Sequence, residues 1–251
     1  MTPDPEAYCF HRDFAPAGPA PFHVGRHYLL YAKSGTLRLE AEGLRWTLPP
    51  ARAALIAADH PVTIAILTQL TTASVLFAPG FMSAPPRAVT VFDVSPLARE
   101  LIHECRDFGP DSVLDAYARA LFTTLSAVAL KLCNTPSPFV LPVPSSPQLQ
   151  RALDLTEAQA AGQPVFGAIA RATGQSPRAL SRRFAAEMGM SWQQALRRIR
   201  LMRAVELLAS TADPVTEIAM TVGYTSLSAF NAAFRELVAM SPTQYRASFR
   251  A

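Results

Sequence analysis

The sequence has few charged residues, few cysteines and no long apolar run, and each shortage excludes a class of protein. Only 17% of its 251 residues are charged while 50% are hydrophobic, which argues against disorder and allows cores for two domains. No run of about 18 apolar residues occurs, so we expect no membrane-spanning helix and no membrane partner. The first fourteen residues carry Asp4, Glu6 and Asp13 and no apolar core, so we expect no secretory signal.

The three cysteines, Cys9, Cys105 and Cys133, lie far apart in the sequence. Their spacing fits neither a metal site nor a disulfide framework, so we expect free thiols that fill core space in a reducing cytoplasm. A Gly-rich phosphate loop and a Ser/His/Asp arrangement are also missing from the sequence. We therefore predict that the chain is not an enzyme and needs no cofactor.

A stretch near residue 170 reads as a helix, a tight turn and a second helix. Ile169–Ala170 is an apolar turn, and Gly174 can take the left-handed conformation that ends a helix. Ser176 suits the N-cap of the next helix, and Pro177 suits its first position because no amide donor is needed there. The pattern predicts a helix-turn-helix whose second helix, which runs to Phe184, enters the major groove of DNA.

The same pattern recurs further along the chain. Ile218–Ala219, Gly223, Ser226 and Phe234 repeat the first set at an offset of 49 residues up to the glycine and 50 from the serine onwards. A supersecondary unit that repeats is a stronger indication than a single motif. The alternative is a pair of ordinary helical hairpins in an all-α domain.

With these two stretches, residues of about 148–248 resemble the tandem helix-turn-helix domain of AraC/XylS-type transcription regulators. Besides the repeat itself, the matching phrases are Gly189-x-Ser191, Arg200-Leu201-x2-Ala204-x2-Leu207-Leu208, Gly223-Tyr224, Phe230-x3-Phe234 and Ser241-Pro242-x2-Tyr245-Arg246. Two positions depart from the family pattern. Trp192 stands where the family usually has proline, and Ala239 stands where it usually has glycine.

The positive charge is concentrated in the same part of the chain. Residues 145–251 hold 12 arginines, no lysine and 7 acidic residues, a net charge of +5. Residues 1–144 hold 11 Lys and Arg and 12 acidic residues, a net charge of −1, so the two parts give the formal +4 of the whole chain. A phosphate-binding surface requires such an excess, and the planar fork of arginine binds phosphate and guanine edges at two points.

Residues 1–94 read as an all-β domain. Residues 1 to about 22 are rich in Pro, Ala and Gly, and we expect an irregular arm there. From residue 27 the pattern has period two and predicts short strands at 28–31, 36–42, 44–48, 53–58, 61–67 and 73–77, which favour a small antiparallel barrel. The phrase from Tyr28 to Glu42, with Leu48-Pro49-Pro50 and His60-Pro61, resembles the cupin-like sensor half of the same family.

Residues 95–134 are predicted to form two helices, the first capped by Ser95 and the second by Asp111 or Ser112. Apolar side chains step along the second helix by three or four residues and form one stripe. The stripe consists of Leu114, Tyr117, Leu121, Leu125, Val128 and Leu132. It either packs on the β domain of the same chain or forms the seam of a homodimer, as helices in this position do in the family.

Four prolines between Pro136 and Pro144 predict an extended, stiff linker without a helix over residues 135–146. The expected fold therefore has two domains. An all-β, cupin-like barrel (1–94) is followed by two helices (95–134), and an all-α tandem helix-turn-helix domain occupies residues 147–251.

A long helix over Trp192–Ser210 is predicted between the two helix-turn-helices. A helix of about 18 residues spans roughly 27 Å. This length is near the ~34 Å between successive major grooves on one face of DNA. We therefore expect a rigid helix that holds both reading helices one turn of DNA apart.

The outward residues of each second helix are the candidates for reading bases. In the first copy they are Arg178, Ser181 and Arg182, where the resemblance also places base contacts. We expect Arg178 and Arg182 to read guanines, each worth about 1–3 kcal/mol of discrimination. The alternative is that these arginines only hold phosphates.

The outward residues of the second copy carry no charge. They are Leu227, Ser228, Asn231 and Ala232. Asn231 can read adenine and Leu227 can contact a thymine methyl, so we expect less discrimination from this half. Further candidates, for phosphate contact or a structural role, are Ser176, Ser226, Arg200 and Arg246; for Arg200 an ion pair with Glu206 or Glu217 is the alternative.

A small barrel can also hold a ligand. The candidate lining residues are His23, His27, Tyr31, Trp46 and His60, and the alternative is that they are ordinary barrel packing. His23 and His27 are four residues apart, which suits metal ligands on a helix, but they precede a strand. We therefore predict no metal site.

These observations point to a cytoplasmic, sequence-specific DNA-binding transcription regulator that is controlled through its N-terminal domain by a small-molecule effector or by dimerisation. The expected partners are double-stranded DNA, an effector, a second copy of the chain and, for an activator, RNA polymerase. Two alternatives stay open. One is a metal-dependent cupin enzyme fused to a DNA-binding domain, and the other is a regulator whose N-terminal domain serves only assembly.

Overall fold

The computed structural model describes residues 5–250, with side chains described for residues 5–248. Within this range the chain forms two compact units. The first unit comprises residues 5–41, 47–137 and 247–250, and the second comprises residues 42–46 and 138–246.

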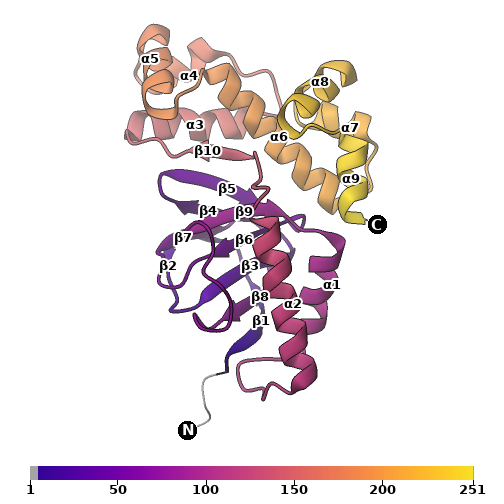
Figure 1. Ribbon diagram of the computed structural model, residues 1–251. Coiled ribbons are helices and arrows are strands. Elements are labelled where there is room, and N and C mark those ends of the chain that lie inside the picture. Colours follow the sequence, from indigo (N-terminus) through magenta and orange to yellow (C-terminus); the bar gives the residue numbers. More distant parts are fainter. Residues whose placement is uncertain (1–4, 251) are drawn as a thin grey trace. The chain divides into compact units, whose positions relative to one another are not determined.

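Two antiparallel β-sheets form most of the first unit (Figure 1). One sheet has the order β1 (Ala7–Phe14), β8 (Leu70–Phe77), β3 (His27–Ser34), β6 (Arg52–Ile56) and β9 (Val89–Asp93). In the other, β7 (Val62–Ile66) pairs with β4 (Leu37–Ala41) on one side and with β2 (Ala17–Phe22) on the other. The predicted all-β character of this region is therefore confirmed.

The predicted irregular arm at residues 1 to about 22 is wrong for the described residues. β1 pairs with β8 along its whole length, from Ala7 opposite Phe77 to Phe14 opposite Leu70. β2 pairs with β7 despite Pro19 and Pro21. β2 is the end strand of its sheet, where a proline that cannot donate a hydrogen bond is tolerated.

Two helices, α1 (Pro96–Cys105) and α2 (Ala116–Leu132), cover one face of the first sheet (Figure 1). Their apolar side chains and those of the sheet share one core, which includes Leu29, Val75, Phe92, Ile102 and Phe122. Burial of this apolar surface is the main force that holds the helices on the sheet.

The predicted N-cap is correct for α1 and wrong for α2. Ser95 caps α1 as expected, since its hydroxyl accepts a hydrogen bond from the backbone N of Ala98 at 3.2 Å. The predicted start of α2 at Asp111 or Ser112 is wrong. Asp115 caps this helix instead, and its carboxylate accepts from the backbone N of Ala118 at 2.8 Å.

The second unit is helical. Its helices are α3 (Pro147–Gln159), α4 (Phe166–Ala172), α5 (Pro177–Met188), α6 (Trp192–Ser210), α7 (Val215–Thr221), α8 (Leu227–Val238) and most of α9 (Pro242–Arg250). A short strand, β10 (Val140–Pro142), pairs with residues 44–46 of β5 (Leu44–Leu48). The fold class predicted for the C-terminal part, an all-α tandem helix-turn-helix, is confirmed.

The turns that follow α5 and α8 have the same backbone conformation but different residues. Gly189 has a φ of 64° and Ala239 a φ of 59°, both left-handed. For an L-residue with a Cβ this conformation costs about 1–2 kcal/mol. Glycine avoids that cost. It also increases the conformational entropy of the unfolded chain, which lowers the free energy of unfolding by about 0.4–1 kcal/mol.

We predict that Ala239→Gly raises the free energy of unfolding by roughly 0.8 kcal/mol, the difference between the central values of these two effects. The matched change in the first copy, Gly189→Ala, is expected to lower it by a similar amount. A Cβ at Gly189 would meet no atom within 4 Å, so only backbone strain acts there. Urea unfolding of both variants checks this, and an Ala239→Gly protein less stable than the parent contradicts it.

Candidate nucleic-acid interface

The first helix-turn-helix consists of α4 and α5 and has the predicted turn. Gly174 has a φ of 67°, in the left-handed region that favours glycine. Ser176 caps α5, and its hydroxyl accepts from the backbone N of Ala179 at 3.2 Å. Leu180 and Phe184 are fully buried, so the inner side of α5 is fixed against the rest of the unit.

The outer side of α5 faces solvent. Arg178, Ser181 and Arg182 are exposed, as the sequence predicted. The next arginine, Arg183, lies 3.5 Å from a carboxylate oxygen of Glu187 on the same helix. Two guanidinium groups and one hydroxyl are therefore free to approach the edges of base pairs from this helix.

The second helix-turn-helix consists of α7 and α8. Its turn contains Gly223 with a φ of 93°. A Cβ at Gly223 would lie 2.5 Å from the backbone O of Ala160 and 2.9 Å from the guanidinium of Arg200, so only glycine fits. Phe230 and Phe234 are fully buried on the inner side of α8.

The outer side of α8 is less polar than that of α5. Ser228 and Ala232 are exposed, while Leu227 and Asn231 are half-buried. Arg235 lies one helical turn after Asn231, is also exposed, and was not among the predicted reading residues. Its spacing of four residues from Asn231 is the signal that could have identified it.

The long helix α6 joins the two helix-turn-helices and has the predicted bounds, Trp192–Ser210. Ser191 and Gln194 form a capping box at its start. The indole N of Trp192 donates to the hydroxyl of Thr156 at 2.9 Å, and its ring lies 5.0 Å from that of Phe166. The residue that departs from the family pattern thus ties α6 to α3 and α4.

α5 and α8, here called the reading helices, lie along the same edge of the second unit (Figure 1). The 19 residues of α6 between them span roughly 28 Å. This length is near the ~34 Å between successive major grooves on one face of DNA.

Two of the four residues suggested for phosphate contact, both arginines, donate to backbone carbonyls of other segments. The Nε and Nη2 atoms of Arg200 donate to the backbone O of Ala160 at 2.9 Å and of Gly162 at 2.7 Å. Of the two acids suggested as ion-pair partners of Arg200, Glu206 pairs with Arg203 on the same helix. Arg200 thus ties α6 to the end of α3.

Of the other three phosphate candidates, Arg246 also donates to a backbone carbonyl, whereas the two serines are N-caps. Nη2 of Arg246 donates to the backbone O of Asp213 at 2.7 Å, which holds α9 to the segment before α7. Ser176 and Ser226 are exposed N-caps at the starts of the reading helices. Helix N-termini attract anions, so these two serines keep positions that suit phosphate.

Glu187, near the end of α5, has a role that sequence reasoning missed. Its carboxylate accepts from the backbone N atoms of Ser145 (3.1 Å) and Ser146 (2.8 Å) and from the hydroxyls of both (3.0 and 2.7 Å). Partial burial raises the pKa of Glu187, but these hydrogen bonds outweigh it and the net pKa is lowered. No sequence pattern links residues so far apart.

The five residues suggested for an effector pocket have different surroundings. His23 is exposed, and Nδ1 of the buried His27 accepts from the backbone N of Ala58 at 3.0 Å. Burial lowers the pKa of His27. Tyr31 packs in the core shared with α1 and α2, and Trp46 belongs to the second unit. His60 is half-buried, and a pocket lined by these five residues stays a prediction.

The apolar stripe of α2 is used inside the first unit. Leu121 and Leu125 are buried in its core, and Val128 and Leu132 pack against that core. Leu114 precedes the helix and packs there too, whereas Tyr117 is 57% exposed. The prediction that Leu121 and Leu125 form part of a dimer seam is therefore wrong, because both pack in the core of their own chain.

The three cysteines are buried free thiols. Burial raises the pKa of Cys9 to about 12 and that of Cys133 to about 11, which keeps both thiols protonated and unreactive at neutral pH. Among the described residues, no group of three or more His, Cys, Asp or Glu side chains could hold a metal ion. In the same range no helix is both long and apolar enough to cross a membrane.

Comparisons with known proteins agree with this geometry. The sequence model of a family described as a helix-turn-helix domain matches residues 169–248. The chain is 26% identical over 231 residues to the HTH-type transcriptional regulator NimR of Escherichia coli (strain K12), over 90% of this chain and 82% of that protein. It is 39% identical over 75 residues to the HTH-type transcriptional regulator MtrA of Neisseria gonorrhoeae, over 30% of this chain and only 25% of that protein.

Solved structures with similar parts include the C-terminal domain of AraT, a response regulator from Geobacillus stearothermophilus. It is 36% identical, with a TM-score of 0.39, over 41% of this chain and 85% of that chain. ToxT from Vibrio cholerae is 12% identical, with a TM-score of 0.43, over 98% of this chain and 100% of that chain.

We predict that Glu187→Gln lowers the free energy of unfolding by about 1–2 kcal/mol at pH 7, because charge-assisted hydrogen bonds become neutral ones. A carboxylate with a lowered pKa stabilises the folded state above its ordinary pKa of 4.5 and loses this effect as the pH falls below it. The difference between the two proteins should therefore shrink between pH 5 and pH 3. Urea unfolding at several pH values measures this, and a constant difference contradicts it.

Proposed function

Because the chain belongs to the AraC/XylS family of transcription regulators, we propose that it recognises a specific DNA sequence through the exposed faces of α5 and α8. The chain is a DNA-binding regulator, and the finer assignment concerns which residues read the sequence. The observation that carries the proposal is the arrangement of two reading helices on one rigid helix. α5 buries Phe184 and exposes Arg178 and Arg182, while α8 buries Phe230 and Phe234 and exposes Ser228.

In this proposal the two reading helices do different work. Arg178 and Arg182 of α5 read guanines, because a guanidinium matches the O6 and N7 acceptors of guanine. Asn231 of α8 reads adenine, and Ser228 and Leu227 make weaker contacts. The half-site under α5 therefore supplies most of the discrimination.

The first unit is proposed to control DNA binding, either through a small-molecule effector or through homodimerisation. A homodimer would use surfaces other than Leu121 and Leu125, which are buried. An activator of this kind would also contact RNA polymerase, and its place of work would be the cytoplasm. A regulator whose first unit serves only assembly is the competing proposal.

We predict that Arg182→Ala lowers discrimination at one G·C pair of the operator by about 1–3 kcal/mol, or roughly 5- to 150-fold in affinity. The operator is first obtained by selection from random duplexes, and affinities are then measured for the four base pairs at each position. Arg151→Ala, which removes an exposed arginine from α3, is the matched control. Equal weakening on all sequences by Arg182→Ala would leave that arginine only a phosphate role.

The same selection tests the difference between the reading helices. Substitutions in the half-site under α5 should cost more affinity than substitutions in the half-site under α8, because guanidinium contacts to guanine are stronger than those of Asn231 and Leu227. The opposite order would contradict the division of work proposed above.

Control by an effector predicts that a small molecule raises the melting temperature of the purified protein, since a ligand that binds only the folded state stabilises it. The screen is paired with elemental analysis, because a metal-dependent cupin enzyme would carry stoichiometric metal. A library without any stabilising compound would favour the assembly-only alternative.

A further inference from the structure

A groove runs along the contact between α6 and α8, beside the reading face of α8. It has a volume of about 430 Å³. The α6 side is lined by Gln193, Leu196, Arg197 and Arg200, and the other side by Tyr224, Ala229, Ala232 and Ala233. Ala232 is exposed on the outer side of α8, so the groove and the reading face share a border.

Two arginines of α6 line this groove, Arg197 and Arg200. Within the described residues, Arg197 differs from Arg200 because it makes no hydrogen bond to backbone carbonyls near the end of α3. Its Nη2 atom lies 2.5 Å from a carboxylate oxygen of Glu236 on α8. The side chains of Arg197 and Glu236 are 39% and 72% exposed. Arg200, by contrast, is held by two backbone carbonyls.

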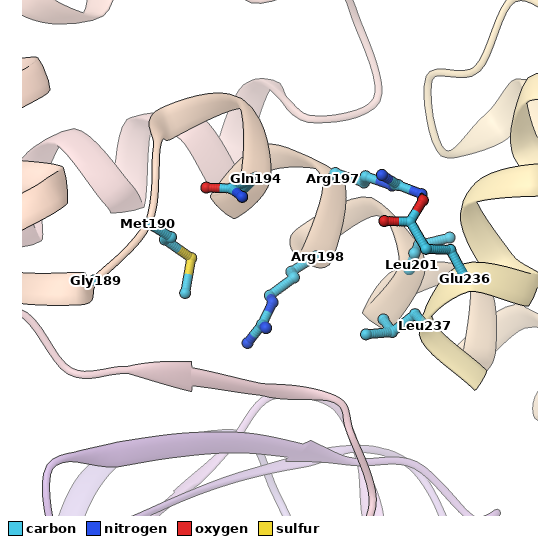
Figure 2. A pocket seen from close by; sticks show the side chains of 8 residues that line it. All are labelled: Gly189, Met190, Gln194, Arg197, Arg198, Leu201, Glu236 and Leu237. Carbon is cyan, nitrogen blue, oxygen red and sulfur yellow. The ribbon is translucent and has the colours of Figure 1, made fainter. Parts of the chain in front are cut away.

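Figure 2 shows how the neighbouring arginines of α6 diverge. Arg197 points towards Glu236, whereas Arg198 points towards β10, where its Nη1 atom donates to the backbone O of Val140 at 2.9 Å. Arg197 also lines a smaller cavity of about 240 Å³, together with Met190 and Leu237. The consecutive residues Arg197 and Arg198 thus contact different elements. Arg197 pairs with α8, and Arg198 bonds to β10.

DNA that is engaged by both reading helices must present its sugar–phosphate backbone to the protein between the two major grooves. The helix that spans this interval is α6, and the opening beside it on the α8 side is the groove that contains Arg197. A guanidinium prefers phosphate because it can bind two oxygens in one plane. An ion pair between exposed side chains contributes little to stability, so Arg197 can exchange Glu236 for another anion at small cost.

We propose that Arg197, assisted by Gln193, binds a DNA phosphate between the two major grooves, and that Glu236 occupies Arg197 in the absence of DNA. The inference rests on the proposed function. Glu236 also repels phosphate by its own charge, so it weakens binding to every duplex equally. The site carries no base contact and therefore sets affinity and salt dependence, while the reading helices set sequence preference.

The test measures the affinity of the full chain for its selected operator and for a scrambled duplex between 50 and 200 mM salt. Each phosphate contact contributes about 0.9 to the slope of log affinity against log salt. For Arg197→Ala we expect the slope to fall by about this amount, so that the loss of affinity over this salt range is about three-fold smaller than for the parent. The change should be the same on both duplexes.

Three further variants separate the proposed role from a structural one. Arg197→Lys keeps the positive charge and should keep most of the slope. Glu236→Gln leaves Arg197 in place and should tighten binding to both duplexes. Arg151→Ala removes an equal charge from α3 and should leave the slope nearer that of the parent. Melting temperatures show whether each variant is folded.

Two results overturn the inference. One is an Arg197→Ala protein whose salt slope equals that of Arg151→Ala. The other is a Glu236→Gln protein that binds DNA no better than the parent, and this second variant decides the matter if Arg197→Ala does not fold. Failure of the proposed function looks different, because the parent itself would then show no sequence preference between the two duplexes.

Discussion

The guanidinium of Arg200, on α6, contacts both the segment after α3 and the turn of the second helix-turn-helix. It donates to the carbonyl of Ala160, the C-cap of α3, and to that of Gly162 in the turn that follows. It also lies over the ring of Tyr224, with 5.7 Å between the guanidinium carbon and the ring centroid, and against Gly223. The first helix of the unit, the long helix α6 and the second helix-turn-helix are thereby fixed together.

This constraint explains why the two reading helices differ in chemistry but not in construction. Each begins at a capping serine, buries a phenylalanine eight residues later and ends at a left-handed residue. Since the framework is common to both, the outward residues are free to differ, and α5 carries Arg178 and Arg182 where α8 carries Ser228 and Ala232. Affinity and sequence preference can therefore be distributed unequally along the DNA without a change of fold.

The parts that local sequence signals determine were predictable, and the parts set by distant contacts were not. The caps of α5 and α6, the glycine turns and the bounds of α6 follow from residues within one or two helical turns of each other. β2 was missed because its prolines suit an arm as well as an edge strand, and its pairing partner lies some 45 residues away. Glu187 was missed for the same reason, since its four donors lie about 40 residues earlier. The stripe on α2 was recognised, but a pattern of apolar residues does not say which surface covers it.

The hydrogen bonds of Glu187 have a mechanical consequence. Both backbone amides and both hydroxyls of Ser145 and Ser146 converge on one carboxylate of α5. The segment that precedes α3 and the C-terminal end of α5 are therefore coupled, because neither can move away from the other without breaking these four hydrogen bonds.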